Sequence, residues 1–85
     1  MYRIVFTRQA DRSLRKMSRN TARLIRDKLD QLAQDPYARN PNLTRLQGRP
    51  GYRLRVGDWR VIYELEEDRL VILVLKIAPR GEVYR

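Results

Sequence analysis

Three arginines, Arg53, Arg55 and Arg60, alternate with apolar residues along the stretch from residue 52 to residue 64. Gly57 divides this stretch into two runs, and glycine accepts the positive φ that a two-residue hairpin turn needs. Side chains of a strand point to opposite faces with a period of two. If the tyrosine and tryptophan side chains face the core, the three arginines stand together on the other face. The stretch therefore predicts a hairpin with one cationic surface.

Two further residues that could do chemistry lie near the end of the sequence. Arg80 follows the last long apolar run, and Tyr84 lies four residues beyond it. In an antiparallel sheet both can converge with the hairpin arginines at one end. Guanidinium groups present a planar fork of donors that suits phosphate. The alternative is a positive but inert sheet face, and the residues alone leave the two interpretations equal.

The charge of the chain favours a polyanionic or acidic partner. The 85 residues carry a formal net charge of +9, and sixteen of the nineteen basic residues are arginine. Nucleic acid is the natural partner of such a surface and an acidic protein is the second. An arginine-biased, solvated surface without a partner is the third interpretation. The length predicts a single domain over residues 1–85.

The residue types that are missing limit the chemistry. The sequence has no cysteine and no histidine, which excludes disulfides, a thiolate zinc site, a cysteine nucleophile and the usual general base. The acidic residues show no ligand spacing, so neither a metal site nor a cofactor is expected. No apolar run approaches the roughly 20 residues of a membrane span, and no signal-peptide core is present at the N-terminus. We therefore expect a cytoplasmic protein with no membrane partner.

Hydrophobic periodicity predicts one strand and two helices before the hairpin. Residues 2–6 alternate as a short strand. Two amphipathic helices follow, the first capped by Thr7 and the second by Ser18 or Asn20. The second helix should end just before Pro36, because proline disfavours helical backbone in the residue that precedes it. So few residues separate the helices that an antiparallel pair is expected.

The second half of the chain predicts a sheet. Residues 36–51, with three prolines and two glycines, are expected to form a connecting loop. Residues 66–68 form a polar turn, and the run 70–77 is apolar on both sides, which predicts a central strand. Pro79 should end this strand, and residues 82–85 should form an extended tail. The predicted fold is α+β, a small antiparallel sheet with an N-terminal αα-hairpin packed on one face, in the order β-α-α-β-β-β.

Much of the chain resembles the RelE/ParE superfamily of bacterial and archaeal toxins, on its RelE side. The likeness rests on Leu46-Gln-Gly48, the hairpin Tyr52-Arg-Leu-Arg-Val-Gly-Asp-Trp-Arg-Val-Ile-Tyr63, the run 70–77 and the ending Arg80-Gly-Glu-Val-Tyr84. The resemblance implies a RelE-like toxin that cleaves mRNA in the ribosomal A site. It also implies a cognate antitoxin, with an acidic or amphipathic segment, that silences the toxin. Operator DNA would be bound only through that antitoxin.

The resemblance also assigns roles within the cationic set. Arg60 and Arg80 match phosphate-stabilising positions of the family, and Arg53 and Arg55 stand where RelE-like toxins often carry lysines. RNA cleavage without a metal needs a base for the ribose 2′-OH, and Tyr84 is the candidate because neighbouring cations favour a phenolate. Arginine effectively gives up no proton. Arg53 and Arg55 should therefore bind phosphate, and the group that protonates the leaving oxygen is unassigned.

Two other functions are compatible with the same fold. ParE relatives are understood to inhibit DNA gyrase without catalysis, and an inactive relative could serve only to bind antitoxin and operator DNA. Cationic residues at all four RelE positions, together with Tyr84, favour a metal-independent endoribonuclease over both alternatives. Fold analogy alone does not fix function, so all three functions stay open at this point.

Overall fold

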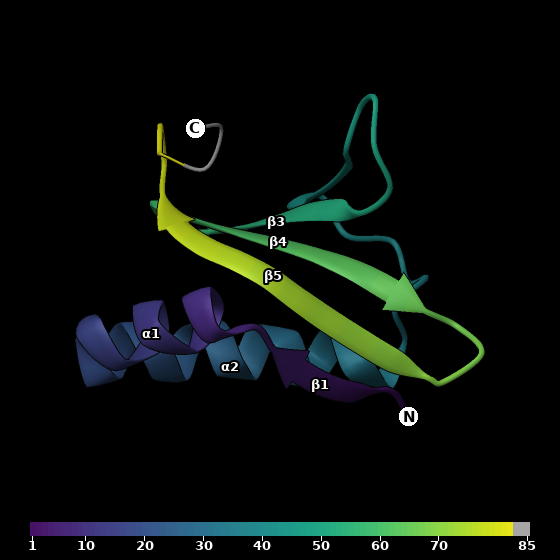
Figure 1. Ribbon diagram of the computed structural model, residues 1–85, viewed down its shortest axis with the longest axis horizontal. Coiled ribbons are helices and arrows are strands. Elements are labelled where there is room, and N and C mark those ends of the chain that lie inside the picture. The colour runs from purple at the N-terminus through teal and green to yellow at the C-terminus, as the bar shows by residue number, and fades with distance from the viewer. Residues whose placement is uncertain (83–85) are drawn as a thin grey trace.

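Two helices pack against one face of a five-stranded sheet in this computed structural model, which describes residues 1–82 (Figure 1). The elements are β1 (Arg3–Phe6), α1 (Arg8–Lys16), α2 (Arg19–Gln34), β2 (Leu43–Arg45), β3 (Tyr52–Val56), β4 (Trp59–Glu66) and β5 (Val71–Pro79). This arrangement confirms the predicted α+β class and the αα-hairpin on one face of the sheet. Residues 83–85, which include Tyr84 and most of the expected tail, lie outside the described residues.

The sheet is mixed, with the strand order β1-β5-β4-β3-β2. Of the three long strands, β4 runs antiparallel to both β3 and β5, as predicted. However, β1 pairs parallel to β5, so the prediction of a wholly antiparallel sheet was wrong for this strand. Parallel pairing needs a long crossover connection, and here the chain between the two strands contains the helix pair and the rest of the sheet. The position of β5 between β1 and β4 agrees with its apolar character.

The expected loop at residues 36–51 contains a short edge strand. Its three residues, Leu43–Arg45, pair antiparallel with β3, so that Thr44 lies opposite Arg53. Three residues are too few to show a clear alternation. β5 ends at Pro79, the residue that was predicted to end it. Proline is tolerated at the last ladder position because no further N–H donor is required there.

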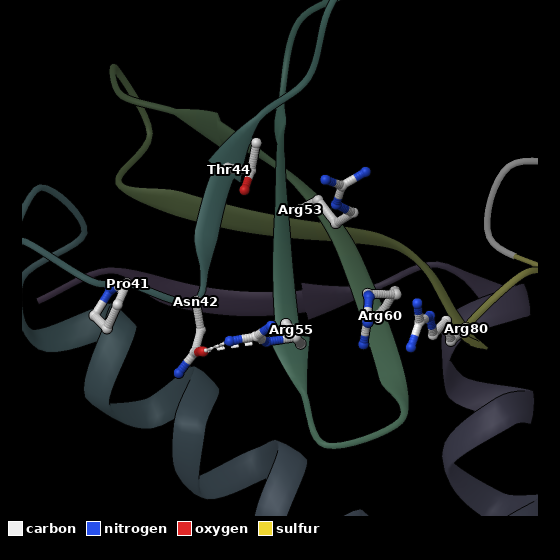
Figure 2. A pocket seen from close by; sticks show the side chains of 7 residues that line it. All are labelled: Pro41, Asn42, Thr44, Arg53, Arg55, Arg60 and Arg80. Carbon is white, nitrogen blue, oxygen red and sulfur yellow. Dashed lines mark hydrogen bonds between the residues drawn. The ribbon is translucent and has the colours of Figure 1, made fainter.

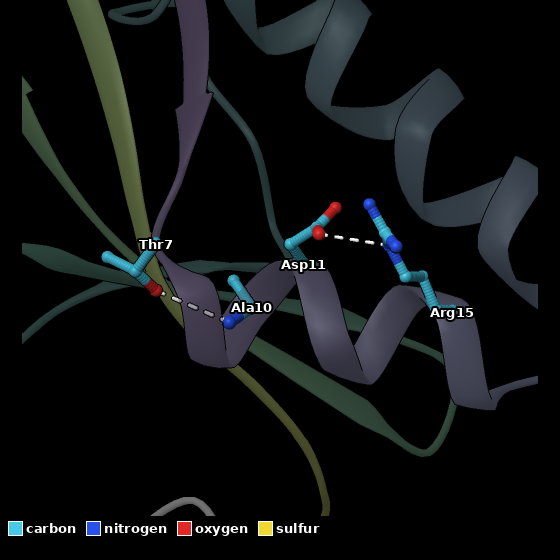
Figure 3. A network of polar contacts seen from close by, with 4 residues as sticks. All are labelled: Thr7, Ala10, Asp11 and Arg15. Carbon is cyan, nitrogen blue, oxygen red and sulfur yellow. Dashed lines mark hydrogen bonds and ion pairs between the residues drawn. The ribbon is translucent and has the colours of Figure 1, made fainter.

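The helices begin and end where their capping residues indicate. The Thr7 hydroxyl accepts a hydrogen bond from the Ala10 N–H at 3.3 Å, and Asp11 pairs with Arg15 one turn later (Figure 3). Ser18, rather than Asn20, caps α2. Each cap satisfies a backbone donor that the first helical turn leaves without a partner.

Helix α1 also protects the part of β5 that β1 does not reach. The register of β1 ends at Val74. Beyond it, the Thr7 hydroxyl donates to the Leu75 carbonyl at 2.7 Å, and the Gln9 side-chain oxygen accepts from the Ile77 N–H at 3.3 Å. Side chains thus replace the missing strand along this edge, which would otherwise be a site for unwanted pairing.

The core lies between the helices and one face of the sheet. Alternate residues of the β3–β4 hairpin point into it, as their spacing predicts. Tyr52 and Tyr63 are cross-strand partners whose rings stack with centroids 5.4 Å apart. The Tyr63 hydroxyl is buried, and within residues 1–82 it has no hydrogen-bond partner. Burial, and secondarily the nearby Tyr52, raise the pKa of Tyr63.

We expect Tyr63→Phe to stabilise the protein. An unsatisfied buried hydroxyl costs roughly 1–3 kcal/mol, so removing it while keeping the stacked ring should raise the free energy of unfolding by about 1 kcal/mol. Urea denaturation of the wild type and the variant measures this difference. Tyr52→Phe is the matched control, because it changes the half-buried ring of the same stack. A clear loss of stability in Tyr63→Phe would mean that the hydroxyl has a partner, such as a buried water.

Candidate functional site

A groove of about 350 Å³ opens on the sheet face that points away from the helices (Figure 2). We call it the arginine groove. Residues from β2, β3 and β4, from the turn before β2 and from the turn after β5 line it: Pro41, Asn42, Thr44, Arg53, Arg55, Arg60 and Arg80. All four arginines that the sequence predicted for the site therefore meet in one place. Tyr84 lies outside the described residues, and its part in the site stays a prediction.

The hairpin register places two of these arginines directly opposite each other. Arg55 pairs with Arg60, and Arg53 lies two residues along the same face, opposite Ile62. In Figure 2 the side chains of Arg55, Arg60 and Arg80 form a row across the groove. Like charges in opposing positions of a sheet are destabilising. The arrangement therefore favours the binding of an anion that bridges or neutralises the row.

Arg60 is a constrained cation of the groove. Its Nη1 donates to the backbone carbonyls of Gly57 and Trp59, both at 3.0 Å. Partial desolvation, followed by the charges of Arg80, Arg55 and Arg53, lowers the pKa of Arg60, and Asp58 opposes this shift. A guanidinium remains protonated in spite of such a shift. Arg60 is thus a cation that the protein partly desolvates and holds in one orientation.

Arg80 reaches the groove because the end of β5 is tied to the β3–β4 turn. Its backbone N–H donates to the Asp58 carbonyl at 2.7 Å. The turn that follows is closed by a bond from the Glu82 N–H to the Pro79 carbonyl at 3.0 Å. The Lys76 ammonium also donates to the Glu82 carbonyl at 3.4 Å. These contacts fix Arg80 beside Arg60, although twenty residues separate the two in sequence.

A small apolar patch lies beside the arginine groove. Ile62 and Ala78 are buried there, on the face opposite the main core, and Leu46 and Leu75 pack against them. A shift of the β4–β5 register at Ile62 leaves Leu75 without an opposing residue on β4. Such a bulge turns local side chains out of strict alternation. The arginines of the groove therefore lie next to a surface of packed apolar side chains.

The sequence interpretation missed the residues that precede and form β2. Asn42 accepts two hydrogen bonds from the Arg55 guanidinium, at 3.3 Å from Nε and 2.8 Å from Nη2. Thr44 lines the groove from the strand itself. A contact between a turn and a strand thirteen residues away has no periodic signature. The one sequence signal for this segment is Asn40-Pro41-Asn42, because asparagine and proline favour a turn.

Two other structural properties concern the possible classes of function. Among residues 1–82, no group of three or more acidic side chains is arranged so that it could hold a metal ion. In the same part of the chain, neither helix is long and apolar enough to cross a membrane.

Comparison with known proteins identifies the class. Residues 4–84 match the family of the ParE toxin of the type II toxin–antitoxin system, parDE. A chain of the archaeal RelE–RelB complex from Pyrococcus horikoshii is 32% identical, with a TM-score of 0.81 over 95% of this chain and 97% of that one. A chain of the intact E. coli RelBE toxin–antitoxin complex is 21% identical (TM-score 0.80, 96% and 99% covered). The YoeB/ParE toxin from Agrobacterium tumefaciens is 14% identical (TM-score 0.78, 92% and 98% covered).

These likenesses confirm the resemblance that the sequence motifs suggested. No curated protein matches the sequence. The fold is that of a small α+β toxin, since chains of both RelE–RelB complexes superpose over nearly their whole length. The chain belongs to the RelE/ParE superfamily, and it is a toxin of a type II toxin–antitoxin system.

We expect repulsion within the arginine groove to be measurable as a salt-dependent loss of stability. Arg80→Gln should raise the free energy of unfolding at low salt by a few tenths of a kcal/mol, since exposed or cross-strand charge pairs contribute roughly 0.2–1 kcal/mol. The gain should disappear near 1 M NaCl, where the screening length falls to about 3 Å. Arg23→Gln, on the exposed surface of α2, removes the same charge away from the groove. An equal gain in both variants would attribute the effect to net charge and not to the groove.

Proposed function

We propose that this toxin is a ribosome-dependent endoribonuclease that cleaves mRNA in the A site and so inhibits translation. The observation that carries the proposal is the meeting of four arginines in one groove, with Arg55 and Arg60 in opposing positions. Pre-oriented cations of this kind stabilise the charge that develops on a phosphate during in-line attack. The 32% identity to a chain of an archaeal RelE–RelB complex supports the RelE side of the superfamily.

In the proposed reaction the ribose 2′-OH attacks the adjacent phosphorus to form a 2′,3′-cyclic phosphate, and the bond to the 5′ oxygen of the next nucleotide breaks. That oxygen takes up a proton from water, since no donor in the chain is assigned. Arg60 and Arg80 stabilise the phosphate oxygens, and Arg53 and Arg55 hold the RNA backbone. Tyr84 accepts the 2′-OH proton as the base, a role that rests on the sequence alone. The chain has no histidine or cysteine, and we assign no metal or cofactor to this chemistry.

The partner that silences the toxin is proposed to be a cognate antitoxin with an acidic or amphipathic segment. The solved relatives include toxins in complex with RelB antitoxins, from Pyrococcus horikoshii and from Mycobacterium tuberculosis. A segment of opposite charge laid over the arginine groove would remove the repulsion between Arg55 and Arg60. We propose that operator DNA is contacted only through the antitoxin.

ParE-like inhibition of DNA gyrase is the second candidate function, because the matching family is that of the ParE toxin. A gyrase inhibitor needs a binding surface and no catalytic groups. The crowding of Arg53, Arg55, Arg60 and Arg80 around one groove is more than a non-catalytic surface requires, and it costs stability. This crowding favours the endoribonuclease. Cleaved mRNA or a DNA-damage response in cells distinguishes the two functions.

Cleavage should depend on the ribosome. The described part of the groove contains no histidine and no carboxylate, whereas positioned acid–base groups contribute roughly 10²–10⁴-fold in other enzymes. Orientation of the substrate can supply about 7–11 kcal/mol, and a ribosome that holds mRNA in line could provide it. We expect rapid cleavage of a labelled mRNA in a programmed ribosome with an empty A site and negligible cleavage of the same mRNA alone. Equal cleavage of the two samples would contradict ribosome dependence.

In cells, Arg60→Ala, Arg80→Ala and Tyr84→Phe should each abolish growth arrest without lowering thermal stability. Arg23→Ala, on the exposed surface of α2, is the matched control and should remain toxic. Mapping of new mRNA 5′ ends after induction of the wild type should show cuts within translated codons. A DNA-damage response with intact mRNA would indicate gyrase instead. Loss of toxicity accompanied by a collapse of stability would make these residues structural.

A further inference from the structure

Asn42 holds the Arg55 guanidinium by one particular edge. The Asn42 Oδ1 accepts from Nε at 3.3 Å and from Nη2 at 2.8 Å (Figure 2). These two nitrogens form the side edge of the guanidinium. Because arginine has only donors, the amide oxygen and not the amide nitrogen must face it. The edge that makes no hydrogen bond with the described residues is the terminal one, formed by Nη1 and the second hydrogen of Nη2.

Arg60 is held by its Nη1, whereas Arg55 is held by its Nε and Nη2. Its Nη1 carries two hydrogens, and the carbonyls of Gly57 and Trp59 provide two acceptors for them. The side edge of Arg60, formed by Nε and Nη2, is therefore the edge available for a ligand. Arg55 and Arg60 lie opposite each other on neighbouring strands. The groove thus offers the terminal fork of Arg55 and the side fork of Arg60 on two neighbouring strands. Each fork can bind two phosphate oxygens.

The turn that carries Asn42 is itself well fixed. The Asn42 N–H donates to the Asn40 Oδ1 at 2.9 Å, and the Asn42 carbonyl accepts from the Arg55 N–H at 2.8 Å. The next residue, Leu43, starts β2 and pairs with Leu54. Asn42 is half-buried. Because both backbone groups of Asn42 are hydrogen-bonded, its side chain can fix the rotamer of Arg55. A precise binding site needs such support from neighbouring residues.

We propose that Asn42 is a positioning residue of the arginine groove, which turns Arg55 so that its terminal edge binds an RNA phosphate beside the one bound by the side edge of Arg60. This inference rests on the proposed endoribonuclease function. Without Asn42, Arg55 keeps its charge but samples several rotamers, and each binding event must restrict them again. The loss should appear in kcat/KM, while the fold stays intact.

A double-mutant cycle tests whether Asn42 acts through the guanidinium. Arg55→Lys keeps the charge but has neither the Nε donor nor the planar fork. We expect Asn42→Ala to lower kcat/KM on programmed ribosomes roughly tenfold, within the range of coupling between contacting residues. In the Arg55→Lys background the same change should have less than about a twofold effect, since the contact is already gone. Equal losses in both backgrounds would overturn the proposal.

Asn20→Ala is the matched control for the loss of an asparagine side chain. Asn20 is exposed in α2 and does not line the arginine groove. Its kcat/KM should remain within about twofold of the wild type, as is usual for a surface change without a shared partner. A loss as large as that of Asn42→Ala would overturn the specific role of Asn42.

A second measurement reports the contact without any cleavage. In ¹H–¹⁵N spectra of the full chain, hydrogen exchange of the Arg55 Nε–H should be slow in the wild type and fast in Asn42→Ala. An unchanged exchange rate would overturn the inferred contact. If the wild type does not cleave mRNA on ribosomes, the proposed function and the RNA role of Asn42 fail together. If the wild type cleaves and Asn42→Ala cleaves equally well, only the role of Asn42 is overturned.

Discussion

The register of the β3–β4 hairpin is the constraint on which the rest of the molecule depends. With Leu54 opposite Val61, and Tyr52 opposite Tyr63, the apolar side chains enter the core and the arginines face outward. A shift by one residue would move each side chain to the other face. It would bury guanidiniums against the helices and expose the largest buried side chain of the core, that of Tyr63. The same register therefore determines both folding and the position of the groove.

The two faces of the sheet contribute unequally to stability. The helix-covered face of the sheet buries the large core cluster, whereas on the other face Ile62 of β4 and Ala78 of β5 form a small buried cluster beside the cationic groove. Opposing arginines on that second face lower stability, and the core offsets this loss. Local destabilisation that the rest of the fold supports is typical of functional sites. The inference from this pattern to a nucleic-acid substrate depends on the chemistry of guanidinium and phosphate, not on the fold.

Much of this architecture follows from short-range patterns, and the missed parts depend on long-range contacts. Strand alternation and Gly57 were sufficient to predict which side of the hairpin carries Arg53, Arg55 and Arg60, because both properties are local. The helix caps were predicted for the same reason, although Ser18 and Asn20 were equivalent until the structure distinguished them.

The direction of β1, the edge strand β2 and the contact of Asn42 with Arg55 could not be predicted from the sequence pattern. Each joins segments that are separated along the chain, and none leaves a periodic signature. The convergence of Arg80 with the hairpin was predicted only as a possibility of an antiparallel sheet. Its causes are the register of β4 with β5 and the backbone bond from Arg80 to Asp58, which no residue-type pattern encodes. The role of Tyr84 still rests on sequence reasoning, as it lies outside the described residues.

Every cation that lines the groove is an arginine, and this limits how the charge of the groove can be changed. A site built with histidine or a desolvated lysine can lose its charge when the pH changes. Guanidiniums keep theirs over the whole physiological range, so the charge of these arginines does not change with pH. Neither acidification nor a rise in pH within a living cell can switch it off. A bound partner of opposite charge can neutralise these arginines, so control of this surface depends on how much of that partner is present and not on pH.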